Sequence, residues 1–433
     1  MLPSRRATQR PIAPHPRSPR SERITVRPAL TQTAQFPSVS APVRRAIDAA
    51  LYGEALSADD GCALIRASGA DLAAAMAAAA ELNLRARPHR RVTYSRKVFL
   101  PLTNLCRDRC GYCTFVKGPG QAGAHTMTPD EVLAVARRGA ELGCKEALFS
   151  LGDHPEWRHP EMAEQLDRLG YPSTPAYAAA MAQLVLEETG LLPHTNCGVL
   201  SRDEMAALAP WNVSMGIMLE SVSETLFEPG GAHYGTTSKS PEQRIATLEA
   251  AADFGVAMTT GILIGIGESL EDRVDSLIAI RDAQGRRGNI QEIIVQNFRA
   301  KPSTRMRAAA EPSLVDMLRT QAAARLLLGP EMNVESPPNL NADGCGAYLL
   351  AGNNDWGGVS PLTKDFINPE AAWPEVAALR AITAEAGFEL RERLALFPDY
   401  AASGRWYPSA AVAHRAGELV ADDGYVRPES EVR

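Results

Sequence analysis

A repeated pattern, in which a short apolar run precedes a helix-start signal, constrains the fold of this chain more than any other feature. The helix starts have a Ser or Thr N-cap followed three residues later by an acid or amide, as in a capping box. They begin at Thr128, Ser201, Ser240 and Ser269. The apolar runs are RKVFLPLT, KEALFSLG, VSMGIMLE, AMTTGILIGIG and EIIVQNF. The pattern predicts a repeated strand-helix unit.

The apolar runs also indicate how the strands are arranged. Strands that are apolar throughout are buried on both faces, so we expect a parallel sheet with helices outside it. This many units favour an α/β fold of the (β/α) TIM-barrel type over an open, doubly wound sheet, and no phosphate-binding fingerprint follows the first strand. Because the chemistry of such barrels lies at the carboxyl ends of the strands, the unusual residues are expected there.

Three of the seven cysteines are clustered in the segment CRDRCGYC, directly after the first expected strand. Cys106, Cys110 and Cys113 should therefore project into the mouth of the barrel. A structural zinc site would need a fourth ligand, commonly from a second Cys-x-x-Cys pair, and core packing does not explain thiols beside charged residues. A 4Fe-4S cluster held by three thiolates leaves one iron open to a ligand, and the spacing favours this interpretation.

The Cys-x-x-x-Cys-x-aromatic-Cys spacing resembles the signature of the radical S-adenosylmethionine (SAM) enzymes. The resemblance implies a radical SAM barrel with a 4Fe-4S cluster and SAM as cofactors and an unidentified low-potential electron donor. In these enzymes the open iron chelates SAM, and reduction releases a 5'-deoxyadenosyl radical that abstracts hydrogen. The resemblance implies that SAM contacts come from Tyr112, Asp153, Glu220, Ser221, Arg244 and Gly265.

Each implied SAM contact has its own role. Asp153, in SLGDHPE, is expected where the SAM amino group is received, with a helix cap or turn residue as the alternative. Glu220 and Ser221 are expected at the ribose hydroxyls, and Tyr112 and Gly265 at the adenine. Arg244 resembles the arginine that pairs with the SAM carboxylate in the biotin-synthase-like branch, with an ordinary surface arginine as the alternative.

Longer segments resemble the first-subunit (CofG-type) half of the FO synthase family, from about residue 95 to residue 400. The resemblance implies a radical lyase that cyclises 5-amino-5-(4-hydroxybenzyl)-6-(D-ribitylimino)-5,6-dihydrouracil to the deazaflavin of coenzyme F-420 and releases ammonia. Because only one cysteine cluster is present, the second-subunit (CofH-type) activity is expected on a separate chain. The segments are CRDRCGYCTF, GLLPHTN, EPGGAHYG, TTGILIGIGES, IQEIIVQNFRAKP, SPPNLN and NDWGGVSPLTKDFINPEAAWP.

Such a substrate presents a phenol, a uracil edge and a polyol, so its pocket should combine aromatic and polar groups. Further candidates are His194 and Asn196, with a satisfied core histidine as the alternative. Trp356 could instead belong to the core and Asp355 to a turn. The expected substrate contacts are Asn297, beside Gln296, and Asn339, Asp355, Trp356 and Ser360.

Composition limits the remaining possibilities. The 433 residues carry a formal net charge of -6, which gives no general affinity for nucleic acid. No apolar run approaches the roughly 20 residues of a membrane span, and no secretory signal is seen, so a cytoplasmic protein is expected. The expected regions are a disordered basic extension (1–42), a helical region (43–90), the core barrel (91–330), the barrel completion with a substrate loop (331–410) and a tail (411–433).

Two alternatives to this function remain open. One is a related radical SAM activity, either the second FO synthase subunit or a futalosine-pathway menaquinone enzyme. The other is a non-catalytic iron-sulfur or zinc-binding scaffold. The chain also departs from the family pattern at Ala257, Met258 and Asn353, of which Asn353 could alter the substrate loop.

Overall fold

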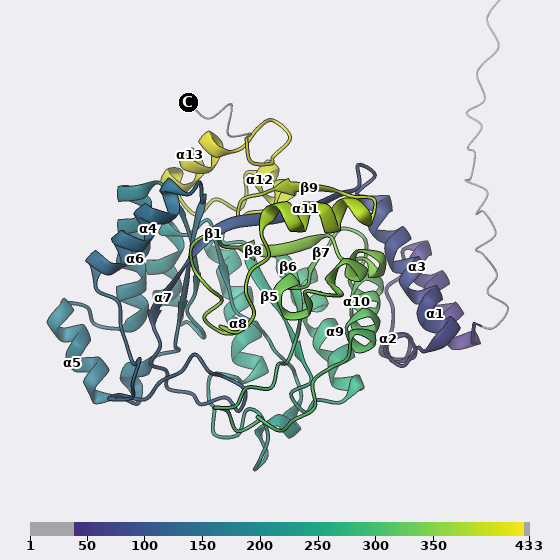
Figure 1. The fold of residues 1–433 in the computed structure, drawn as a ribbon, viewed down its shortest axis with the longest axis horizontal. Coiled ribbons are helices and arrows are strands. Elements are labelled where there is room, and N and C mark those ends of the chain that lie inside the picture. The colour runs from purple at the N-terminus through teal and green to yellow at the C-terminus, as the bar shows by residue number, and fades with distance from the viewer. Residues whose placement is uncertain (1–38, 428–433) are drawn as a thin grey trace, which may run out of the picture. The chain divides into compact units, whose positions relative to one another are not determined.

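The computed structural model describes residues 39–427, and its centre is a closed barrel of eight parallel strands (Figure 1). Each strand pairs with the next along the chain, and β1 pairs with both β2 and β8, which closes the ring. The expected barrel is therefore confirmed and the open sheet is excluded. The strands are β1 (Arg91–Thr103), β2 (Glu146–Leu151), β3 (Leu192–Asn196), β4 (Ser214–Gly216), β5 (Met258–Ile264), β6 (Ile290–Asn297), β7 (Asn333–Glu335) and β8 (Asp355–Val359).

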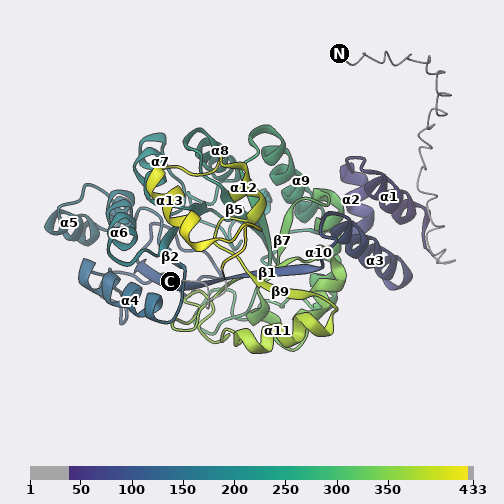
Figure 2. The same ribbon diagram turned by 90° about the horizontal axis from the view of Figure 1, so that it is seen from above.

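Helices surround the barrel on its outer side (Figure 2). The N-caps expected from the sequence begin these helices: the side chains of Thr128, Ser201 and Ser269 form complete capping boxes, and Ser240 accepts a bond from the Gln243 N–H. These bonds satisfy backbone N–H groups that have no partner within the helix. The helices are α4 (Pro129–Glu141), α5 (Pro160–Leu169), α6 (Thr174–Thr189), α7 (Arg202–Leu208), α8 (Pro241–Ala251), α9 (Leu270–Arg287), α10 (Leu314–Leu328) and α11 (Val376–Glu385).

Three further helices precede the barrel and pack against α9 and α10: α1 (Ala41–Tyr52), α2 (Ala58–Ile65) and α3 (Gly69–Ala86). The alanine-rich face of α3 is buried, which allows a close approach to the small side chains of α10. In residues 39–427, no single helix is long and apolar enough to cross a membrane. The bent pair α2 and α3, taken together, reaches the length and apolar composition of a membrane span.

Strand β9 (Glu389–Glu392) pairs in parallel with the first residues of β1 at the amino-terminal end of the barrel. Helices α12 (Pro398–Ser403) and α13 (Ala410–Leu419) follow, and Val412, Ala416 and Leu419 are buried in a second apolar cluster with Trp406. Residues 410–427, which fall largely within the expected tail, thus pack onto the barrel. Residues 1–38 of the expected basic extension, and residues 428–433, lie outside the described residues.

Candidate active site

The three clustered cysteines lie in the loop after β1, at the carboxyl end of the barrel. All three line a cavity of about 380 Å³ that extends into the barrel, and none forms a disulfide. Cys106 is buried, while Cys110 and Cys113 are half-buried. The structure thus places the thiols where the strand pattern predicts them.

The chemistry of these thiols fits a metal cluster. Burial raises the pKa of Cys106 to about 12 and that of Cys110 to about 11, so both thiols keep their protons at neutral pH unless a cation replaces them. The Cys106 sulfur accepts backbone N–H groups of Asp108 at 3.4 Å and Asp153 at 3.2 Å, which would stabilise a thiolate. Three thiols in one loop are a donor set suited to iron-sulfur ligation.

Two neighbouring segments hold the cysteine loop in place. The buried Asp108 carboxylate accepts bonds from the backbone N–H groups of Thr237 (3.0 Å) and Ser238 (3.2 Å) and from the Ser238 hydroxyl. At the end of β2, Gly152 lies so close that an added Cβ would overlap the carbonyl oxygen of Leu105. The loop is therefore positioned by the chain after β4 and by a contact that only glycine permits.

Asp153, directly after β2, lines the cavity as expected, but its carboxylate is already engaged. One oxygen lies 2.7 Å from the Arg107 Nε and 2.8 Å from the His154 Nδ1, and the other accepts the Val199 N–H at 2.9 Å. Burial alone would raise the pKa of Asp153, but the bonds to His154 and Arg107 outweigh it, so the pKa is lowered. The carboxylate therefore ties the loop after β2 to the cysteine loop and to the end of β3.

His154 lies in the left-handed region, with φ of 33°, and is buried between two carboxylates, Asp153 at 2.8 Å and Glu204 at 3.0 Å. Burial alone would lower the pKa of His154, but the bonds to both carboxylates raise it to about 9. The imidazole is therefore charged at neutral pH, and it links the loop after β2 to helix α7.

This histidine predicts a specific pH dependence of stability. The charged His154 adds most to the free energy of unfolding below the ordinary histidine pKa of about 6.5. This contribution is lost as the pH rises through about 9. The loss should be about 3 kcal/mol relative to a His154→Gln variant, as the shift in pKa implies. Melting temperatures of both proteins, followed from about pH 6 to pH 10, test this; parallel curves would contradict the charge assignment.

Two of the expected SAM contacts after β4, Glu220 and Arg244, also line the cavity. Glu220, in the left-handed region with φ of 66°, accepts a bond from the Lys239 Nζ at 2.6 Å. Arg244 is only 5% exposed and donates from Nε to the Ser238 carbonyl at 2.8 Å and from a second nitrogen to the Met218 carbonyl. Arg244 is therefore a buried lining residue and not a surface arginine.

Tyr112 lines the cavity beside these groups, whereas Ser221 and Gly265 do not. The Tyr112 hydroxyl lies 3.2 Å from the His233 Nε2. The Ser221 hydroxyl accepts the Ser223 N–H at 3.1 Å, and the Gly265 N–H donates to the Glu268 carboxylate at 2.7 Å. Ser221 and Gly265 thus shape the loops after β4 and β5.

Among the described residues that line the cavity, none of the five expected substrate contacts is found. Trp356 is fully buried, and its indole N–H donates to the Thr383 hydroxyl of α11 at 3.0 Å. Trp356 therefore faces the outer helices, as the core alternative proposes. The others bond to neighbouring side chains: Asn297 to Asn341, Asn339 to Asp365, Asp355 to Arg393 and Ser360 to Thr363.

The alternation of side chains along a strand explains part of this difference from the expected lining. Successive residues of a strand point to opposite faces, so Gln296 lines the cavity while its neighbour Asn297 does not. His194 lines the cavity as well, with its ring nitrogens bonded to Ser214 and Asn196. Burial lowers the pKa of His194 to about 3, so the ring is neutral.

Sequence reasoning missed two groups of lining residues. Phe99 and Trp373 stack with ring centroids 5.2 Å apart and form an aromatic wall. The second group consists of charged residues inside the barrel. A charged residue within an otherwise apolar strand was the available signal, because a strand buried on both faces excludes charge unless it has a partner. This group is Lys97, Glu292, Glu335 and Arg393.

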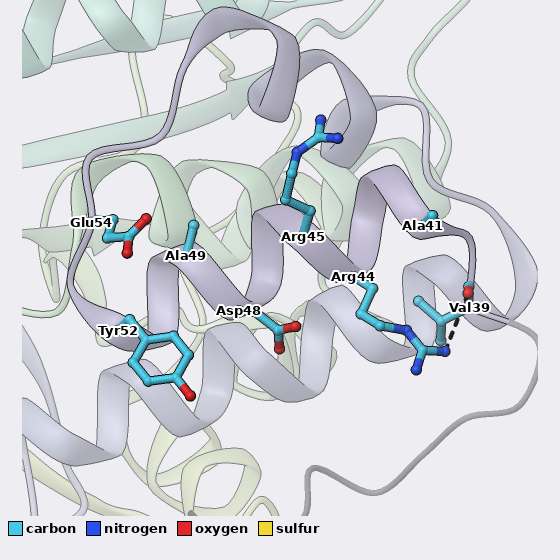
Figure 3. Close-up of a pocket in the computed structure, with 8 residues that line it drawn as sticks. All are labelled: Val39, Ala41, Arg44, Arg45, Asp48, Ala49, Tyr52 and Glu54. Atoms are coloured by element: carbon cyan, nitrogen blue, oxygen red, sulfur yellow. Dashed lines mark hydrogen bonds between the residues drawn. The ribbon is translucent and has the colours of Figure 1, made fainter.

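A second hollow of about 620 Å³ lies along the outer face of α1 (Figure 3). Arg44, Arg45, Asp48 and Tyr52 line it, and the Arg44 guanidinium donates to the Val39 carbonyl. Its lining contains neither a cysteine nor any of the residues expected to bind a cofactor or substrate. This hollow is therefore separate from the site that contains the cysteine loop.

Together, a closed parallel barrel and a three-thiol loop at its mouth define a radical SAM barrel protein. The profile of the radical SAM superfamily matches residues 100–279. Solved structures support the fold: the HydG maturase of Carboxydothermus hydrogenoformans is 16% identical, with a TM-score of 0.64 over 87% of this chain and 88% of that chain. Methylornithine synthase PylB is 17% identical, with a TM-score of 0.62 over 80% and 97%.

Curated relatives narrow the class further. FO synthase of Mycobacterium tuberculosis H37Rv is 50% identical over 377 residues, which are 84% of this chain and 44% of that protein. A 7,8-didemethyl-8-hydroxy-5-deazariboflavin synthase of Methanopyrus kandleri is 47% identical over 336 residues, 78% of this chain and 100% of that protein. The chain belongs to this family of deazaflavin (FO) synthases. The chain spans about half the length of the FO synthases it matches. As a radical SAM protein, it uses a 4Fe-4S cluster and SAM as cofactors.

Proposed function

We propose that the chain cyclises 5-amino-5-(4-hydroxybenzyl)-6-(D-ribitylimino)-5,6-dihydrouracil to 7,8-didemethyl-8-hydroxy-5-deazariboflavin and releases ammonia. The main support is the similarity to the Methanopyrus kandleri synthase, which this chain covers from end to end. The cavity adds support, because it combines three thiols with an aromatic wall and a polar interior. These are the groups that a substrate with a phenol, a pyrimidine and a polyol requires.

We assign the cluster to Cys106, Cys110 and Cys113. When bound, the cluster and SAM supply the radical that begins the reaction by abstracting hydrogen. The chain itself holds the reactants, keeps water away and fixes their orientation. Its apolar walls suit this, because Leu148, Ile217 and Phe115 are among the residues that line the cavity.

We assign SAM to the side of the cavity formed after β4. Arg244 uses two of its nitrogens on backbone carbonyls, which leaves the remaining guanidinium N–H groups for the SAM carboxylate. The Glu220 carboxylate, held by Lys239, is placed to accept hydroxyl groups of the ribose. Tyr112 supplies an aromatic surface beside them for the adenine.

We further propose that a separate second-subunit (CofH-type) chain forms the adduct, and that a low-potential donor delivers the electron. The Methanopyrus kandleri synthase supports this division, because this chain covers all of that protein but only 44% of the Mycobacterium tuberculosis FO synthase. We place the protein in the cytoplasm, because free thiols and a cluster with an open iron suit a reducing compartment.

A direct assay tests the function. The anaerobically reconstituted protein, supplied with the purified hydroxybenzyl adduct, SAM and a reductant, should form the fluorescent deazaflavin together with 5'-deoxyadenosine. Omission of SAM or reductant is the control and should leave the adduct unchanged. If the protein instead turns over only tyrosine plus 5-amino-6-ribitylaminouracil, the activity is that of the second subunit and the proposal is wrong.

A further inference from the structure

Buried ionisable side chains line the part of the cavity that lies inside the barrel. Its lining there includes residues from β1, β3, β6 and β7 and from the segment after β9, each at most 8% exposed. We call this set the polar floor. The polar floor consists of Lys97, His194, Glu292, Glu335 and Arg393.

Arg393 already neutralises two of the acids around the polar floor. Its guanidinium lies 2.6 Å from one Asp355 oxygen and 2.7 Å from the other, and 2.7 Å from Glu292. Oxygens of Glu292, Glu335 and Asp355 lie within 4.8 Å of one another, as in a cation site. Because an arginine and a lysine already lie beside them, a further cation is not needed for charge balance.

Glu335 differs from the other two acids. Burial and the nearby Glu292 and Asp355 carboxylates raise the pKa of Glu335 well above its usual range, so it is protonated and shares its proton with Glu292. No N–H group of the described residues donates to the Glu335 carboxyl, although the side chain is more than nine-tenths buried and lines the cavity. Glu335 therefore offers an unused acceptor oxygen.

Lys97 offers the complementary donors. Its Nζ lies 3.3 Å from the Glu146 carboxylate in the barrel wall, and an ammonium group has three N–H donors. Two adjacent glycines of β8 leave room for these groups: a Cβ on Gly357 would overlap the Glu335 carboxyl, and a Cβ on Gly358 would overlap the Lys97 side chain. The diglycine in NDWGGVSP thus accommodates the polar floor.

We propose that the polar floor binds the ribityl chain of the substrate, an inference that rests on the function proposed above. A hydroxyl group both donates and accepts, so a row of hydroxyls can satisfy the Lys97 donors and the Glu335 acceptor together, which a simple ion cannot. The two rings that join in the reaction must lie near the thiols, where SAM binds. The ribityl chain takes no part in bond formation and is the portion left for the interior.

A binding experiment on the holoenzyme tests this without turnover. The anaerobically reconstituted protein with SAM, but without reductant, is titrated with the hydroxybenzyl adduct and with an analogue that has a methyl group in place of the ribityl chain. Glu335→Leu and, independently, Lys97→Met should each weaken binding of the adduct about tenfold, the effect of losing a buried hydrogen bond. Binding of the methyl analogue should change less than twofold.

Two matched variants serve as controls. Glu335→Gln keeps a neutral group with an acceptor oxygen and a donor, so it should retain the affinity of the wild type for the adduct. Glu249→Gln changes a carboxyl of the outer helix α8 that does not line the cavity, so it should leave the preference for the ribityl compound unchanged.

The possible outcomes separate the two proposals. If the wild type binds both ligands equally, or if Glu335→Leu and Lys97→Met weaken both ligands to the same extent, the ribityl assignment is overturned while the proposed function stands. If the wild type binds neither ligand, the proposed function itself fails, and the ribityl assignment fails with it.

Discussion

Replacement of any one of Cys106, Cys110 and Cys113 with alanine is expected to abolish turnover and to remove most of the iron. A cube held by two thiolates has a second exposed iron. Cys106 and Cys110, whose pKa values are raised by burial to about 12 and about 11, regain their protons when the metal leaves. Iron and acid-labile sulfide per chain, measured after anaerobic reconstitution, should fall from about four atoms each to nearly none.

The matched control is Cys62→Ala, because Cys62 is a half-buried cysteine of α2 that does not line the cavity. This variant should keep the full iron content and the full release of 5'-deoxyadenosine. A loop variant that retains both would show that the thiol at that position is not a ligand.

Gly152→Ala is the second substitution for which we expect a large effect, although it changes no chemical group of the reaction. The added Cβ would overlap the carbonyl oxygen of Leu105 and crowd the Cβ of Cys106, so the cysteine loop must move away from the end of β2. Overpacking of this kind should destabilise the protein by about 3 kcal/mol. Iron content after reconstitution and the melting temperature measure the two consequences.

The control for this substitution is Gly285→Ala in α9, where an added Cβ meets no atom within 4 Å. Alanine is a better helix former than glycine, so this variant should be as stable as the wild type or slightly more stable. If Gly152→Ala reconstitutes a full cluster at the wild-type melting temperature, the close approach between β2 and the loop does not control assembly.

The order of strands and the position of the cysteine loop could be predicted from the sequence because both depend on local signals. The capping residues Thr128, Ser201 and Ser269 begin helices where the pattern places them. The apolar runs that alternate with such helices imply a parallel barrel, and the barrel geometry alone brings the cysteines to its mouth. These conclusions require no knowledge of which face of a strand points inward.

The residues that line the substrate cavity could not be predicted, because they depend on which face of each strand points into the barrel. Trp356 and Gly357 are neighbours in β8, yet only Gly357 lines the cavity. Asp355 is fully buried and bonded to Arg393, a partner 38 residues away that no local pattern reveals. Charged residues inside the barrel take their partners from several strands, as Glu292 does from Thr259 of β5 and from Arg393, so their role appears only once all the strands are in place.

Arg393 and β9 give the order of protein synthesis a structural consequence. Arg91 in β1 bonds to Glu389 across 298 residues, so the first strand leaves the ribosome long before its last partner exists. Until Arg393 is translated, Glu292 and Asp355 lack their buried counter-ion. A chain that stops short of Arg393 should therefore form a less stable barrel, because two buried carboxylates would lack their counter-ion.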